Sequence, residues 1–79
     1  MVRVSEDKKI REFNEIYDLY RDYFTITKVI SIDHSKGEET GEALYLCDSF
    51  EEACKVDVGG LRTIILPGLN RCSTLGGFV

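Results

Sequence analysis

The segment Arg71-Cys72-Ser73-Thr74 holds the residue types best suited to chemistry in this 79-residue chain. A thiol beside an arginine can have a lowered pKa, and Ser73 and Thr74 could join Arg71 in holding an anion. The segment lacks the fixed Cys-to-Arg loop of a phosphatase and the Gly-Lys-Ser/Thr end of a P-loop. We therefore interpret Cys72 as a small apolar contact, with an anion site at Arg71, Ser73 and Thr74 as the alternative.

His34 is the only histidine, so a Cys-His or Ser-His-Asp nucleophile would have to use this residue. It stands beside Asp33 in a polar segment, and the spacing of its neighbours supports no such assembly. Cys47, Cys54 and Cys72 are an odd number without Cys-x-x-Cys spacing, which predicts neither a disulfide framework nor a zinc site. We therefore expect reduced thiols, no metal, no cofactor and no enzymatic activity.

Acidic residues outnumber basic ones, and the net charge of -4 argues against direct binding to nucleic acid or anionic lipid. The carboxylates lie in two stretches and could present a negative array to a partner protein, although a solvated surface explains them equally well. Tyrosine is enriched at interfaces and adds one further candidate. The candidate partner-binding residues are Glu12, Glu15, Asp18, Asp22, Glu38, Glu39, Glu42 and Tyr45.

The length and composition predict one small domain spanning residues 1–79, with residues 69–79 as a C-terminal tail. No run approaches the roughly 18 apolar residues that a membrane helix needs, and the first residues lack the apolar stretch of a signal peptide. We therefore expect a cytoplasmic protein that contacts no membrane.

The first half of the chain predicts a helix followed by a β-hairpin. Apolar residues recur at steps of three and four from Ile10 to Phe24, which favours a helix over residues 5–24 with Ser5 as its N-cap. Residues 25–33 are rich in β-branched side chains and predict a strand. Residues 34–42 are polar and contain two glycines, so they predict a long hairpin loop before a short strand at 43–47.

The second half predicts one more helix and one more strand. Asp48 with Glu51, or Ser49 with Glu52, forms a capping box, and Gly59 and Gly60 end this helix by about residue 57. Residues 61–66 predict a strand, which Pro67-Gly68 ends. For residues 69–79 we expect a helical turn and then a loose end.

These elements predict an α+β fold in which two helices pack on one face of a small, mainly antiparallel sheet. If Val2 and Val4 form a first strand, the order is β-α-β-β-α-β and resembles that of ferredoxin-like domains. Without that strand the order is α-β-β-α-β.

The strand patterns also predict that the second sheet face is partly apolar. Val29, Tyr45 and Cys47 alternate with the core set Ile30, Leu44 and Leu46. An apolar face needs a cover, and the candidates are the C-terminal tail, a second copy of the chain or a different partner.

From these features we expect a small acidic, non-enzymatic protein that binds and regulates or inhibits a larger protein partner. Phage proteins that block host defence enzymes are an analogy at the level of this class. The alternative is a homo-oligomer that binds a small ligand or anion near Arg71–Thr74, and a homodimer is compatible with both hypotheses. A thiol enzyme that uses Cys72 is a third hypothesis.

Overall fold

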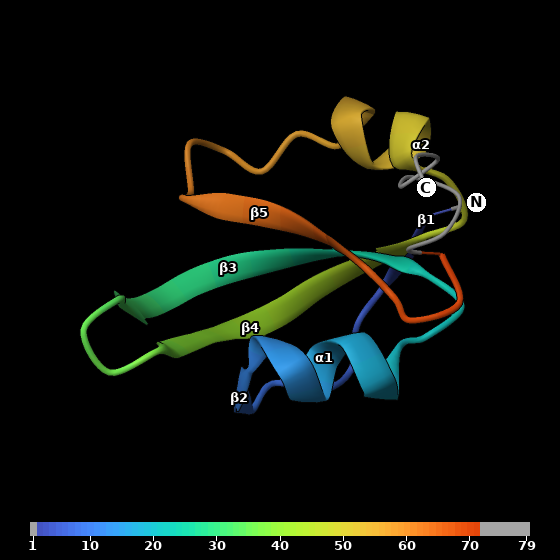
Figure 1. Ribbon diagram of the computed structural model, residues 1–79. Coiled ribbons are helices and arrows are strands. Elements are labelled where there is room, and N and C mark those ends of the chain that lie inside the picture. Colours follow the sequence, from blue (N-terminus) through green and yellow to red (C-terminus); the bar gives the residue numbers. More distant parts are fainter. Residues whose placement is uncertain (1, 72–79) are drawn as a thin grey trace.

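The computed structural model describes residues 2–71, which form a five-stranded antiparallel sheet with two short helices (Figure 1). The strands run across the sheet in the order β1-β4-β3-β5, and β2 pairs with β4 on the same edge as β1. An α+β domain with an antiparallel sheet is thereby confirmed. The elements are β1 Val2–Val4, β2 Ile10–Glu12, α1 Phe13–Leu19, β3 Phe24–Asp33, β4 Glu38–Cys47, α2 Phe50–Lys55 and β5 Thr63–Pro67.

The two helices lie on opposite faces of the sheet, so the prediction that both cover one face is wrong (Figure 1). Helix α1 buries Phe13 and Ile16 against Leu66 of β5. Helix α2 buries Ala53 against a separate cluster that includes Phe24 and Ile26 of β3. The cause is the alternation within the strands, because Phe24 and Ile26 point to one face and Thr25 and Thr27 to the other. Both faces therefore need a helix.

Helix α1 is much shorter than the predicted helix over residues 5–24. Residues 10–12 pair with residues 40–42 of β4, and this ladder overrides the helical spacing of the apolar residues. Ser5 is not an N-cap. Its N–H donates to the Leu44 carbonyl at 2.9 Å, and its buried hydroxyl lies 3.3 Å from the Tyr20 hydroxyl.

The hairpin loop is also shorter than predicted, because β4 begins at Glu38 and only residues 34–37 connect it to β3. The misleading residue is Gly41, which lies inside a strand. A Cβ at this position would lie 2.5 Å from Thr27 Cγ2 and 3.1 Å from Phe13 Cε1. Glycine is therefore the residue that lets α1 approach the sheet closely.

The second half of the chain follows its prediction more closely. Ser49 is the N-cap of α2 and accepts a hydrogen bond from the Glu52 N–H at 3.1 Å. Gly59 and Gly60 both have positive φ, as expected for the turn after this helix. Strand β5 ends at Pro67.

The ferredoxin-like order is not confirmed. The observed order is β-β-α-β-β-α-β, and every strand pair among residues 2–71 is antiparallel. The shorter order α-β-β-α-β is present from α1 onward, preceded by two short edge strands rather than one.

Thr25 lies under α1 with a hydroxyl that has no hydrogen-bond partner within the described residues, although its side chain is only 1% exposed. We expect Thr25→Val to raise the free energy of unfolding by about 1 kcal/mol, because an unsatisfied buried polar group is removed without changing the shape. Urea unfolding followed by circular dichroism measures this. Thr27→Val is the control: its hydroxyl donates a weak 3.5 Å bond to the Thr25 carbonyl, so its gain should be smaller. A destabilised Thr25→Val would contradict the account.

Candidate functional site

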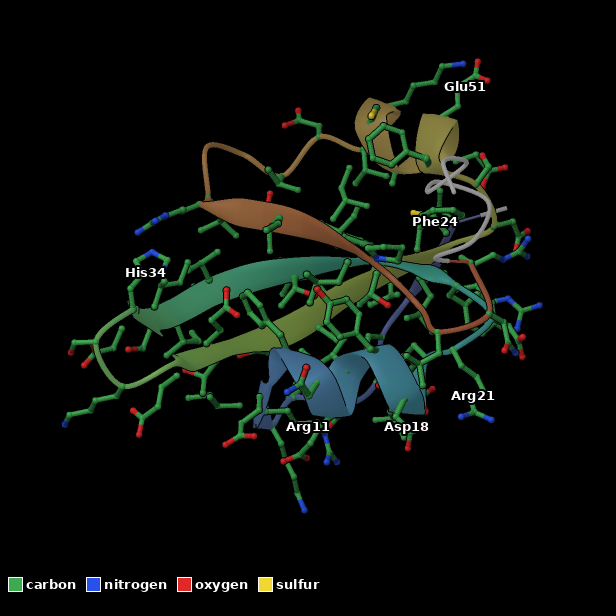
Figure 2. All side chains as sticks on the ribbon, in the orientation of Figure 1. Arg11, Asp18, Arg21, Phe24, His34 and Glu51 are labelled. Atoms are coloured by element: carbon green, nitrogen blue, oxygen red, sulfur yellow. The ribbon has the colours of Figure 1, made fainter. Side chains whose placement is uncertain are left out.

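The predicted acidic array is divided among several elements, and three of its seven carboxylates have side-chain partners. Glu15 on α1 accepts from Arg11 at 3.2 Å, and Asp18 accepts from Arg21 at 2.8 Å (Figure 2). Asp22 follows α1 and accepts from the Asn70 amide at 2.6 Å. These three carboxylates are therefore engaged within the domain.

The other four predicted acidic residues belong to strands. Glu12 ends β2, and it lines a hollow of about 30 Å³ together with Glu39 of β4. Glu38 lies opposite Asp33 in the hairpin, whereas Glu42 lies opposite Lys28. Within residues 2–71 no ion pair involves these four glutamates. The structure brings Glu12 and Glu39 together but does not assemble the set into one surface.

Arg11 is held between two carboxylates. Its Nε donates to Asp7 at 2.6 Å and its Nη1 donates to Glu15 at 3.2 Å. The hydrogen bond from Arg11 is the main reason that the pKa of Asp7 lies below its ordinary value. The same bond raises the pKa of Arg11. This cluster joins the turn before β2 to α1 and serves the fold.

The lowered pKa of Asp7 predicts a pH-dependent contribution to stability. A carboxyl whose pKa is lower in the folded state stabilises the fold above its unfolded pKa, and the contribution is lost as pH falls through the folded pKa. We therefore expect Asp7→Asn to be less stable than the wild type at neutral pH, with the difference vanishing in strong acid. Urea titrations across the acid range measure it. Asp18→Asn is the control, because the Asp18–Arg21 pair is exposed and should contribute little at any pH.

Of the predicted anion site, only Arg71 belongs to the described residues; Ser73 and Thr74 lie outside them, as does the candidate thiol Cys72. The Arg71 Nε donates to the Asp22 carbonyl at 2.8 Å, and its guanidinium lies 5.9 Å from the centroid of the Phe24 ring. Arg71 thus links the segment after β5 to the residues just before β3. Of the tail, Leu69 and Asn70 donate their backbone N–H groups to the carbonyls of Tyr17 and Arg21, and the Arg71 N–H donates to the Gly68 carbonyl.

His34 lies at the tip of the β3–β4 hairpin (Figure 2). Neighbouring Asp33 accepts hydrogen bonds from Ser35 and from the Lys36 N–H, and the Ser35 hydroxyl is the main cause of its lowered pKa. Asp33 therefore shapes the turn. The Cys47 thiol is buried, which raises its pKa, whereas Cys54 is exposed on α2.

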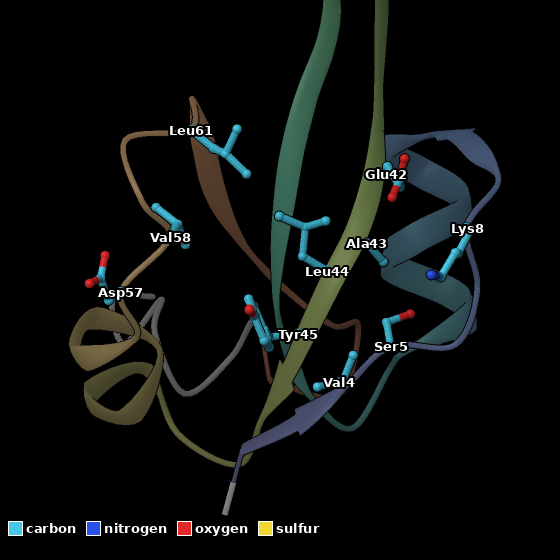
Figure 3. Close-up of a pocket in the computed structure, with 10 residues that line it drawn as sticks. All are labelled: Val4, Ser5, Lys8, Glu42, Ala43, Leu44, Tyr45, Asp57, Val58 and Leu61. Atoms are coloured by element: carbon cyan, nitrogen blue, oxygen red, sulfur yellow. The ribbon is translucent and has the colours of Figure 1, made fainter.

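One hollow lies between β4 and the connection from α2 to β5, and we call it the edge hollow. It has a volume of about 240 Å³. Figure 3 shows side chains from the connection facing β4, with the N-terminal segment on the other side. The lining residues are Val4, Ser5, Lys8, Glu42, Ala43, Leu44, Tyr45, Asp57, Val58 and Leu61.

Two local features build the edge hollow. Strand β4 has a bulge, because Ile26 pairs with Tyr45 while Thr27 pairs with Ala43, leaving Leu44 as the extra residue. Bulges re-aim a side chain, and Leu44 lines the hollow. Opposite it, the Asp57 carboxylate accepts from the Gly59 N–H at 2.8 Å and shapes the turn that carries Val58 and Leu61.

Sequence reasoning found two of these residues, Tyr45 and Glu42, and missed most of the others. The second sheet face is partly apolar, and α2, which was not among the predicted covers, packs on Tyr45 and Cys47 there. A second, more open hollow of about 390 Å³ lies beside α2 and shares Val58 with the edge hollow. A signal that could have located the site is the pair Val56 and Val58 directly after the helix, because apolar residues at that point favour folding back onto the sheet.

No group of three or more histidine, cysteine or acidic residues within residues 2–71 could hold a metal ion. Neither helix of the described chain is long and apolar enough to cross a membrane. Comparisons with models of protein families, with curated proteins and with solved structures find no match to the chain.

Proposed function

We propose that this chain is a non-enzymatic interaction protein that binds a larger protein partner through the edge hollow and the sheet edge beside it. The observation that carries the proposal is an apolar hollow whose rim is exposed. Val4 is 70% exposed and Leu61 is 46% exposed, although both line the same concave surface. Exposed apolar side chains gathered around a hollow mark an interaction surface.

The size of the hollow favours a protein partner over a small molecule. Sites for drug-sized ligands and cofactors usually enclose about 300–1,000 Å³. The edge hollow is smaller, at about 240 Å³, and its lining residues Val4 and Leu61 are exposed to solvent. A side chain from another protein fits such a space, whereas a cofactor would remain largely exposed.

The edge hollow is a better contact surface than the acidic residues of α1. Glu15 and Asp18 are already paired with arginines, so a basic partner would have to compete with Arg11 and Arg21. At the edge hollow a partner would contact exposed apolar side chains, and it would not have to displace an ion pair to do so. Tyr45 contributes a further contact of the type enriched at interfaces.

Affinity capture with three matched baits tests the proposal in a lysate of the source organism. The wild type and Leu19→Lys should recover the same stoichiometric partner, because Leu19 is 50% exposed on α1, away from the hollow. Leu61→Lys places a charge at the rim and should lose that partner. Equal recovery by Leu61→Lys and Leu19→Lys would contradict the proposal, provided that circular dichroism shows both variants folded.

A further inference from the structure

The free edge of β1 lies beside the edge hollow. Among residues 2–71, β1 has one neighbouring strand, β4, and its other edge carries none. The exposure of Val4 agrees with this arrangement. An unpaired strand edge is a template for an added strand from another chain.

The pairing register shows which backbone groups point to this free edge. The Ser5 N–H donates to the Leu44 carbonyl, and Arg3 lies opposite Leu46. In an antiparallel ladder, hydrogen-bonded pairs alternate with pairs that exchange no bond. Arg3 and Ser5 therefore bond to β4, while the N–H and C=O groups of Val2 and Val4 point away from it.

A second copy of the chain is a poor occupant of this edge. In the antiparallel register that overlaps the whole of β1, Arg3 would lie directly opposite Arg3 of the other copy. Like charges in directly opposed positions destabilise a sheet. Two chains that each carry a net charge of -4 also repel one another.

We propose that an extended segment of a protein partner adds as a strand to β1, with an acidic residue opposite Arg3 and apolar residues on either side of it. Directly opposed residues share a sheet face, so the apolar residues would lie beside Val2 and Val4, on the face that holds Tyr45. After Ser5 this protein's own chain no longer runs along the sheet edge. A longer segment of the partner could therefore continue past β1, and its next side chain on the same face would reach the edge hollow. This inference rests on the proposed function and names the partner's chemistry.

Selection from a library of linear random peptides against the full chain tests the inference. We expect enriched peptides with an apolar-acidic-apolar pattern, and selection against Arg3→Glu should replace the acidic residue with a basic one. Val4→Pro removes an N–H that β4 does not use, so it should keep the fold while weakening the binding of an enriched peptide by about tenfold or more. Val4→Thr keeps that N–H and should bind the enriched peptide more tightly than Val4→Pro does.

Three results would overturn the inference: no enriched pattern, the same pattern with Arg3→Glu, or full binding by Val4→Pro. A wild-type dimer that Val4→Pro dissociates in light scattering would assign the edge to a second copy instead. Failure of the proposed function is recognised separately. If Leu61→Lys loses the captured partner while Val4→Pro and Arg3→Glu retain it, the hollow binds but the strand edge does not.

Discussion

Phe24→Ala should lower the free energy of unfolding by about 3–5 kcal/mol, the usual cost of removing a buried phenylalanine. Phe24 is 3% exposed and lies at the centre of the cluster between the sheet and α2. Its ring also contacts Phe50 edge-on, with centroids 6.2 Å apart, and lies below the Arg71 guanidinium. A chain of this length has a total stability of about 4–12 kcal/mol. The variant should therefore lose a large share of the free energy of unfolding and unfold at a lower urea concentration than the wild type.

Urea unfolding followed by circular dichroism measures this loss, and Phe50→Ala is the matched control. Phe50 is 45% exposed, so its removal should cost only the aromatic contact and a little burial, about 1 kcal/mol. Similar small losses for both variants would show that Phe24 is not at the centre of the α2 core.

Gly41→Ala should destabilise the fold by about 2 kcal/mol or more, because the added methyl group has no room. Its Cβ would lie 2.6 Å from the Lys28 carbonyl oxygen as well as against the Thr27 methyl group. A side chain can rotate away, but a backbone carbonyl inside a sheet cannot. Strands β3 and β4 would have to move apart, and this movement would also disturb the packing of the Phe13 ring against the sheet.

Gly37→Asn is the control for Gly41→Ala. Gly37 has a φ of 68° in the hairpin turn, and a Cβ there would meet nothing within 4 Å. Asparagine adopts this conformation more readily than other residues, so the loss should be small. Thermal unfolding of both variants compares them. A stable Gly41→Ala would mean that β3 and Phe13 of α1 do not approach Gly41 as closely as the structure shows.

Local chemistry made some elements predictable. The β-branched run of β3, the cap of α2 at Ser49 and the turn at Gly59 and Gly60 depend on neighbouring residues, so they could be recognised in the sequence. Helix α1 could not be bounded in this way. Its apolar spacing continues through Ile10, yet residues 10–12 gain more from pairing with β4. The spacing of apolar residues does not show that the edge of β4 can accept residues 10–12 as a further strand.

The candidate site depends on contacts between distant parts of the chain. The apolar character of the second face was visible in Tyr45 and Cys47, and this part of the prediction led toward the hollow. The bulge at Leu44 arises from the register of β3 against β4, and the position of Leu61 arises from the path of the connection after α2. Neither feature has a local signature, so the residues that form the hollow needed the structure.

Amide hydrogen exchange of the chain, alone and bound to its captured partner, tests the central claim most directly. We expect the partner to slow exchange in β1 and in residues 57–61, with little change on the exposed side of α1. Protection confined to α1 and the β3–β4 hairpin, with unchanged exchange around the edge hollow, would contradict the claim and return the acidic residues to consideration.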